Sequence, residues 1–135
     1  MIRKAFVMSV YAGQEAEYER RHRPIWLELE QMLKAHGVYN YSIFLHPQTR
    51  QLFGYAEIED EERWAAIAQT PVCRKWWTHM QDLMPANPDH SPQSLALREV
   101  FHIAISTSLT SENRRGRQVL YDARQTIRER ARDEL

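Results

Sequence analysis

The chain has 135 residues, a length that suits one domain with a buried core. Its formal net charge is zero, so no long-range field gathers nucleic acid or anionic lipid. At 43% hydrophobic and 27% charged residues, the composition is that of a globular protein in water. No apolar run reaches the ~18 residues of a membrane span. We therefore expect neither a nucleic-acid partner nor a membrane partner.

The cysteine content and the N-terminus bear on the compartment. Cys73 is the single cysteine, which excludes an internal disulfide framework and is typical of a reducing compartment. Residues 1–8 are too few and too charged to form a signal peptide. The sequence predicts a cytoplasmic protein.

The first third of the chain predicts a strand followed by a helix. Residues 3–10 alternate in the manner of a strand, and Gly13 closes the turn after it. A helix then opens near residue 14 with acidic side chains in its first turn, where the helix dipole favours them. Pro24 removes a backbone donor and should kink or restart this helix, which ends at Gly37. Spacings of three and four place five side chains along one face: Tyr18, His22, Trp26, Leu29 and Leu33.

The remaining elements complete a recognisable order. Residues 39–45 and 51–58 predict two strands joined by a loop of hairpin length. Asp60 caps a helix, and Thr70 with the proline after it starts a second helical piece. Residues 95–105 alternate again and predict a fourth strand. The order β-α-β-β-α-β is typical of the α+β class with a ferredoxin-like fold, an antiparallel sheet with helices on one face.

This architecture has consequences for assembly and for domain boundaries. Helices on one face leave the other face of the sheet bare, so we expect a second copy to cover it in a homodimer, as in dimeric α/β barrels. We place the domain at residues 1–105. Residues 106–135 form a C-terminal Arg-rich extension, a linker followed by a disordered segment or an exposed helix.

Tyr18 and His22 are the first candidates for chemistry. A spacing of four stacks the two rings on one helix face, where a phenol and an imidazole can bracket a small polar ligand. Imidazole gives and takes protons near neutral pH. The alternative is that both rings simply belong to the apolar stripe of the helix.

Three other aromatic side chains and one carboxylate are further candidates. Trp76 and Trp77 point about 100° apart on a helix, so one can anchor the core while the other faces a cleft. Both can instead pack at a dimer interface. Tyr41 needs a hydrogen-bond partner if it is buried, and a sugar hydroxyl would serve. Asp89 lies in a Pro-rich loop and can offer a carboxylate or cap a turn.

Other kinds of site find little support. The six histidines show no metal-ligand spacing, the chain lacks a Gly-rich phosphate loop, and no serine stands in a nucleophile elbow. Cys73 lies on an apolar helix face and is expected to be structural. We expect no metal and no cofactor, which leaves proton transfer or plain binding.

Several motifs in fixed order resemble the L-rhamnose mutarotase family. They are residues 1–8, 18–26, 61–64, 72–77 and 84–89, within a match that spans about residues 1–104. The resemblance implies a dimeric ferredoxin-like fold and an isomerase of the aldose 1-epimerase type, acting on the sugar L-rhamnose. It also implies that His22 is the proton donor. The residues implied to contact the sugar are Tyr18, Tyr41, Trp76 and Trp77. The segment after residue 104 departs from the family, whose members usually end there.

The reaction so implied is interconversion of the α and β anomers. It needs an acid at the ring oxygen and a base at the anomeric hydroxyl, and reclosure reverses both roles. Which oxygen His22 addresses stays open at this point. The alternatives are a heme-binding or oxygenase-type barrel, which uses the same fold, and a non-catalytic sugar-binding module.

Overall fold

A computed structural model describes residues 1–105, so the predicted extension at 106–135 lies outside the described residues. Residues 1–100 form one compact unit. Its regular elements are β1 (Ile2–Ser9), α1 (Glu15–Arg21), α2 (Leu27–Ala35), β2 (Val38–Leu45), β3 (Gln51–Ile58), α3 (Glu61–Ala66), α4 (Pro71–Met80) and β4 (Leu95–Leu97), with short 3-10 turns η1 (Ile67–Gln69) and η2 (Gln81–Leu83).

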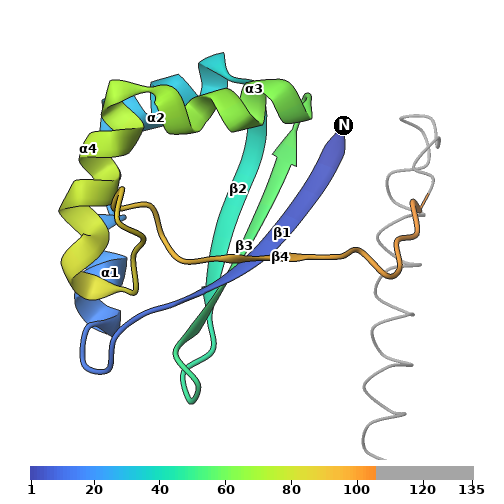
Figure 1. Ribbon diagram of the computed structural model, residues 1–135. Helices are drawn as coiled ribbons and strands as arrows, with labels where there is room; N and C mark the ends of the chain where they lie inside the picture. The colour runs from blue at the N-terminus through green and yellow to red at the C-terminus, as the bar shows by residue number, and fades with distance from the viewer. Residues whose placement is uncertain (106–135) are drawn as a thin grey trace, which may run out of the picture. The chain divides into compact units, whose positions relative to one another are not determined.

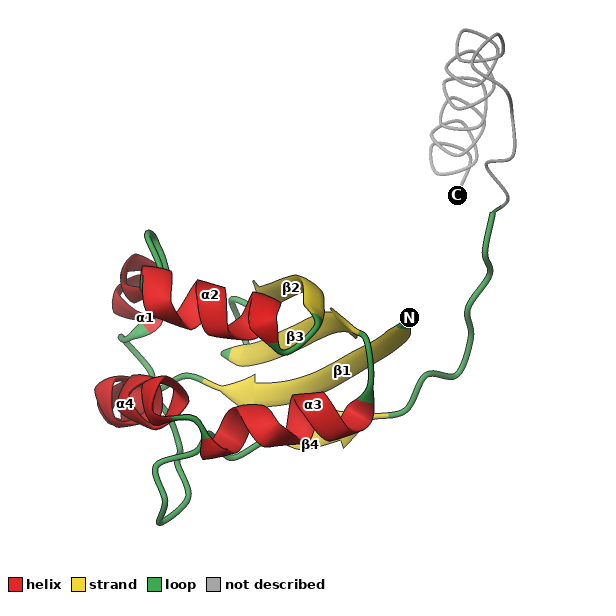
Figure 2. Cartoon of the chain, turned by 90° about the horizontal axis from the view of Figure 1, so that it is seen from above, coloured by secondary structure: helices red, strands yellow, loops and turns green. Residues whose placement is uncertain are grey.

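The four strands form one antiparallel sheet in the order β2-β3-β1-β4. The helices lie on one face of this sheet (Figure 1). Seen from above, α1 and α2 form one row and α3 and α4 a second row (Figure 2). The predicted ferredoxin-like order and the helices on a single face are confirmed.

The core lies between the sheet and the helices. Alternation sends Met8 and its cross-strand partner Leu52 to the helical side, where both are buried. These two side chains belong to one buried cluster that also contains Tyr18. A second cluster surrounds Ile58 and Cys73. The two clusters fix the positions of α1 and α4 against the sheet.

Local signals explain where the helices begin and end. The Asp60 carboxylate accepts the backbone N–H of Arg63 at 2.7 Å, which caps α3. Pro71 stands at the first position of α4, as predicted. The predicted break at Pro24 is confirmed, because the helical segment divides into α1 and α2 around it. Gly37 ends α2 with φ +77°, a left-handed conformation that glycine adopts without strain.

The fourth strand is much shorter than predicted. Only Leu95–Leu97 pairs with β1, and residues 98–105 have no regular secondary structure. Apolar alternation predicted the longer strand, but a strand also needs a neighbour to pair with. With Leu97 opposite Ala5, β1 ends opposite Val100, so it offers no backbone partner to residues 101–105; residues 98–100 lie opposite β1 but are not part of the strand.

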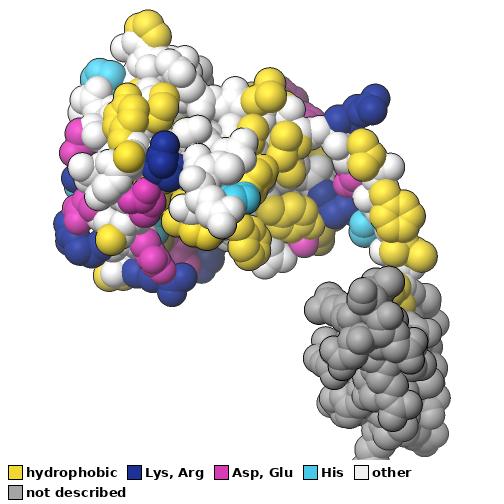
Figure 3. Space-filling model, turned by 90° about the horizontal axis from the view of Figure 1, so that it is seen from below, with side chains coloured by type: hydrophobic (Ala, Val, Ile, Leu, Met, Phe, Trp, Pro, Cys, Tyr) yellow, Lys and Arg dark blue, Asp and Glu magenta, His cyan; other side chains and the backbone are white. Residues whose placement is uncertain are grey.

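The face of the sheet opposite the helices carries apolar side chains. Phe44 stands beside Phe53 across β2 and β3, and Leu95 stands beside Val7 across β4 and β1. Phe44 and Leu95 are 65% and 66% exposed. Apolar side chains gather over the part of the molecule that holds the strands (Figure 3). Within residues 1–105, none of the helices has the length and apolar character needed to span a membrane.

Candidate active site

A cavity of about 1450 Å³ lies between the inner face of the sheet and the helices. This exceeds the roughly 300–1,000 Å³ typical of small-molecule sites, so one monosaccharide would occupy part of it. Five of the six side chains singled out from the sequence line this cavity: Tyr18, His22, Tyr41, Trp76 and Trp77. They come from the end of α1, from β2 and from α4, so the fold brings together residues that are far apart in the sequence.

His22 stands at the C-terminal end of α1, half-buried. Its Nδ1 lies 2.7 Å from the backbone carbonyl oxygen of Tyr18. Because a carbonyl oxygen only accepts, Nδ1 carries the proton of this hydrogen bond. In the neutral ring the lone pair is therefore on Nε2. Burial lowers the pKa of His22, and the bond to the Tyr18 carbonyl opposes that change. The ring is thus a neutral base near pH 7.

Aromatic rings surround His22. The Tyr18 ring lies 4.5 Å away between centroids, and the Trp76 ring meets it edge-on at 5.1 Å. Trp26 and His79 contact Trp76 in turn, at 5.1 and 5.7 Å. Sequence reasoning did not assign Trp26 and His79 to the site, although Trp26 belongs to the stripe of spacings that contains His22.

The two tyrosines bring phenol groups to the cavity. Tyr18 is only 8% exposed, and no group within residues 1–105 hydrogen-bonds its hydroxyl. Tyr41 stacks on Trp64 and meets Phe6 edge-on, each at 6.1 Å between centroids. Desolvation raises the pKa of both phenols, and Tyr18 adds to the shift of Tyr41. Both therefore stay protonated and can donate.

The two neighbouring tryptophans pack differently. Trp76 lies against the cluster that contains Tyr18, and Trp77 lies against the cluster around Ile58. Both are half-buried and both line the cavity, so neither is a pure core residue. In the described part of the chain, neither indole N–H has a hydrogen-bond partner. Both are free to meet a ligand.

Asp89 caps a turn, which was the alternative to a role in the site. Its carboxylate accepts the backbone N–H of Ser91 at 3.0 Å as well as the Ser91 hydroxyl, and these bonds lower its pKa. It does not line the cavity, whereas Asn87 and Ser91 of the same loop do. Sequence reasoning missed these two because the composition of the loop does not distinguish a residue that caps a turn from one that lines a cavity.

Metal and thiol chemistry are not evident in the described residues. Among residues 1–105, no three side chains of His, Cys, Asp or Glu gather closely enough to hold a metal ion. Cys73 is buried, and desolvation raises its pKa to about 11. The thiol is therefore not a nucleophile near neutral pH. His22 is the one imidazole among the described residues that line the cavity, whose wall also carries phenol and indole donors and the carboxylates of Glu15, Glu19, Glu30 and Glu61.

Known proteins share this chain's sequence and fold. A family model described as L-rhamnose mutarotase matches residues 3–103. An L-rhamnose mutarotase of Opitutus terrae is 80% identical over 103 residues, which are 76% of this chain and 99% of that protein. The crystal structure of an L-rhamnose mutarotase from Formosa agariphila is 39% identical with a TM-score of 0.71, and the match covers 77% of this chain and all of that one.

A more distant match shows the fold alone. HapK from Hahella chejuensis is 9% identical with a TM-score of 0.54, over 76% of this chain and 98% of its own. The heme-binding or oxygenase-type alternative is not favoured, because the relatives that match at high identity are mutarotases. On the family model and on the 80% identical relative, the chain belongs to the L-rhamnose mutarotase family.

Proposed function

We propose that the cavity between sheet and helices binds L-rhamnose and that His22 moves the protons which open and reclose its ring. Membership of the family makes the chain an isomerase that interconverts the α and β anomers of this sugar. The observation that carries the site is a set of unpaired polar groups near the imidazole of His22. In the described part of the chain, His22 Nε2, two phenol hydroxyls and two indole N–H groups have no protein partner.

The protonation state of His22 supports an order of steps. In the closed ring, the anomeric hydroxyl has a proton to give and the ring oxygen has none. A neutral imidazole with a free Nε2 lone pair therefore starts by taking the anomeric proton. The bond between C1 and the ring oxygen breaks, its electron pair goes to that oxygen, and C1 becomes an aldehyde.

The same group completes ring opening and then acts in reclosure. To complete opening, the imidazolium gives its proton to the former ring oxygen, which is bonded to the same carbon as the anomeric oxygen in the closed sugar. After rotation at C1, the new hydroxyl attacks the other face of the aldehyde, loses its proton to Nε2, and the carbonyl oxygen recovers one. His22 is then both base and proton donor within one turnover, with no net proton gained or lost.

The other side chains would bind and orient the sugar. Raised pKa values keep Tyr18 and Tyr41 protonated, so each can donate a hydrogen bond to a sugar oxygen. Trp76 and Trp77 would cover the apolar face of the sugar and its C6 methyl group. A pocket for one methyl group discriminates by only ~1–3 kcal/mol, so related 6-deoxy sugars should react more slowly rather than be excluded.

The experiment for this site is a binding titration followed by NMR. Adding L-rhamnose to ¹⁵N-labelled protein should shift the indole signals of Trp76 and Trp77 and the ring signals of His22. The indole of Trp64 also lines the cavity but stacks on Tyr41, and it should move less. Shifts confined to surface amides, with these ring signals unchanged, would place the sugar elsewhere and refute the site.

We also propose that the chain works as a homodimer in the cytoplasm. The support for a dimer is the apolar outer face of the sheet, which carries Phe44, Phe53 and Leu95. A second copy would bring the same face to a two-fold contact. The five side chains of the proposed site all come from one chain, so each copy would hold its own set. Cytoplasmic location rests on the unpaired cysteine alone.

A further inference from the structure

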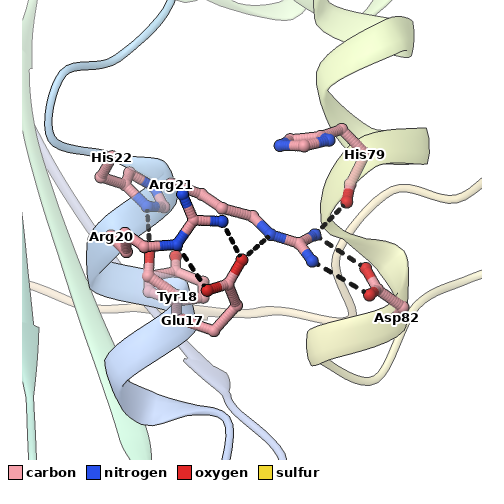
Figure 4. A network of polar contacts seen from close by, with 7 residues as sticks. All are labelled: Glu17, Tyr18, Arg20, Arg21, His22, His79 and Asp82. Atoms are coloured by element: carbon pink, nitrogen blue, oxygen red, sulfur yellow. Dashed lines mark hydrogen bonds and ion pairs between the residues drawn. The ribbon is translucent and has the colours of Figure 1, made fainter.

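Arg21 joins the two helices that carry the proposed site. Its Nε donates to the Glu17 carboxylate at 2.9 Å, within α1. Its two terminal nitrogens donate to the two carboxylate oxygens of Asp82 at 2.9 and 3.1 Å, and one of them also donates to the backbone carbonyl of His79 (Figure 4). The Arg21 side chain is only 15% exposed. One guanidinium therefore connects α1 to the end of α4 and to η2.

The position of this contact relates it to the site. Arg21 directly precedes His22 and lies on the same helix as Tyr18. His79 follows Trp76 and Trp77 on α4, and Asp82 lies in η2 just after it. In the described residues, no other side-chain hydrogen bond or ion pair joins α1 to the segment formed by α4 and η2.

The imidazole itself has no comparable anchor on α4. Its hydrogen bond goes to Tyr18 of its own helix, and its contact with α4 is the edge-on packing against Trp76. The distance between base and indole thus depends on how the two helices are held together. A planar guanidinium with two parallel bonds to a carboxylate fixes both distance and angle, which a lysine ammonium cannot do.

The ion pair between Arg21 and Asp82 is not expected to contribute much to the stability of the fold. Asp82 is 62% exposed, and ion pairs with so exposed a partner contribute little to the free energy of folding. The catalytic rate is more sensitive to the position of the helices, since a displacement of about 1 Å caused by a change far from the reacting atoms can lower the rate about a hundredfold. We propose that Arg21 is a positioning residue, which holds His22 against Trp76 by clamping α1 to the end of α4. This proposal rests on the proposed function of His22.

The test uses three variants and a matched control in the full chain. Arg21→Met removes the donors, Arg21→Lys keeps the charge without the planar fork, and Asp82→Ala removes the acceptor across the helices. Arg20→Met is the control, because among residues 1–105 the neighbouring Arg20 pairs only with Glu17, and it is 71% exposed. Anomer exchange of L-rhamnose is followed by saturation-transfer NMR at several sugar concentrations, which separates kcat from KM.

The clamp predicts a specific pattern of rates. In Arg21→Met, kcat should fall roughly ten- to a hundredfold, while KM and Tm stay close to those of the wild type. Arg21→Lys should recover part of the loss, and Arg20→Met should lose nothing. Asp82→Ala should lower kcat in the same direction, and combining it with Arg21→Met should add no further loss, because both act through one contact. Wild-type kcat in Arg21→Met, or additive losses in the double variant, would overturn the proposal.

A second readout needs no activity. The ring current of Trp76 displaces the NMR signal of the His22 ring C–H in the free protein. That signal should move in Arg21→Met and in Asp82→Ala but not in Arg20→Met; a fall in kcat with this signal unmoved would refute positioning. If Arg21→Met does not fold, Asp82→Ala decides, since its side chain is exposed. A wild-type protein that exchanges no anomers refutes the proposed function, whereas the His22 signal still tests the clamp.

Discussion

The imidazole of His22 meets the indole of Trp76 edge to face, with centroids 5.1 Å apart and ring planes at 87°. The two residues lie on different helices, so this contact joins the proposed base to one wall of the sugar site. An aromatic pair of this kind contributes only ~0.5–1.5 kcal/mol beyond its buried area. Most of the free energy that keeps the two rings in contact must therefore come from the core clusters and the Arg21 contact.

The first prediction concerns pH. Burial lowers the pKa of His22 below its usual value of about 6.5, and the proposed mechanism starts from the neutral ring. Between pH 6.5 and 8 the activity should be level. It should fall as the pH drops through the lowered pKa, because protonation removes the lone pair of Nε2. A profile of kcat/KM against pH measures this, and activity that rises as the pH falls below 6.5 would show that the charged ring is the active form.

The second prediction concerns Trp76, whose indole is proposed to contact the sugar. Replacing Trp76 by Ala removes a ring that contacts His22 and lines the cavity. We expect KM to rise up to about tenfold, the equivalent of an aromatic contact, together with a lower kcat. Tyr11→Ala is the control, because Tyr11 is an exposed aromatic outside the cavity. Equal kinetic effects in the two variants would argue against a sugar contact at Trp76.

The third prediction concerns Gly54, which makes room for Phe6. A Cβ at Gly54 would fall 2.3 Å from the Phe6 ring, and that ring packs against Tyr41. Gly54→Ala should therefore destabilise the fold by ~1–3 kcal/mol through overpacking and weaken sugar binding through Tyr41. Urea unfolding measures the first effect, with the exposed Ser42→Ala as control. Unchanged stability would mean that Phe6 moves aside without cost.

The fourth prediction concerns the outer face of the sheet. Phe44→Glu places a charge where two copies would meet and should yield a monomer in light scattering. Gln48→Glu, in the exposed hairpin, adds the same charge away from the face and should leave a dimer. Phe44 also lines the cavity, but His22 and the proposed sugar contacts all come from the same chain, so the monomeric variant should keep a measurable rate of anomer exchange. A wild-type protein that is monomeric at the concentrations assayed would contradict the proposed dimer.

Local patterns predicted much of this molecule. The spacing of Tyr18 and His22 placed both rings on one helix face, and their centroids lie 4.5 Å apart. Asp60 and Pro71 marked the starts of two helices because caps and prolines act over three or four residues. The break at Pro24 followed from its missing N–H. In each case the cause lies within one turn of the chain.

Contacts between distant segments could not be predicted in this way. Nothing in the sequence pairs Arg21 with Asp82, 61 residues away, or brings Trp76 to His22. The pairing of β4 with β1 covers only Leu95–Leu97, and the apolar alternation in residues 95–105 does not indicate that limit. These features depend on how distant segments pack together, and the periodicity of a single segment carries no information about that packing.

The most direct test of the central claim is anomer exchange in equilibrated L-rhamnose, followed by saturation-transfer NMR with wild-type protein and with His22→Ala. The account predicts enzyme-dependent transfer with the wild type and a loss of about 10²–10⁴-fold in the variant, which should remain folded. Wild-type rates in His22→Ala, or no transfer from folded wild-type protein at high concentration, would contradict it.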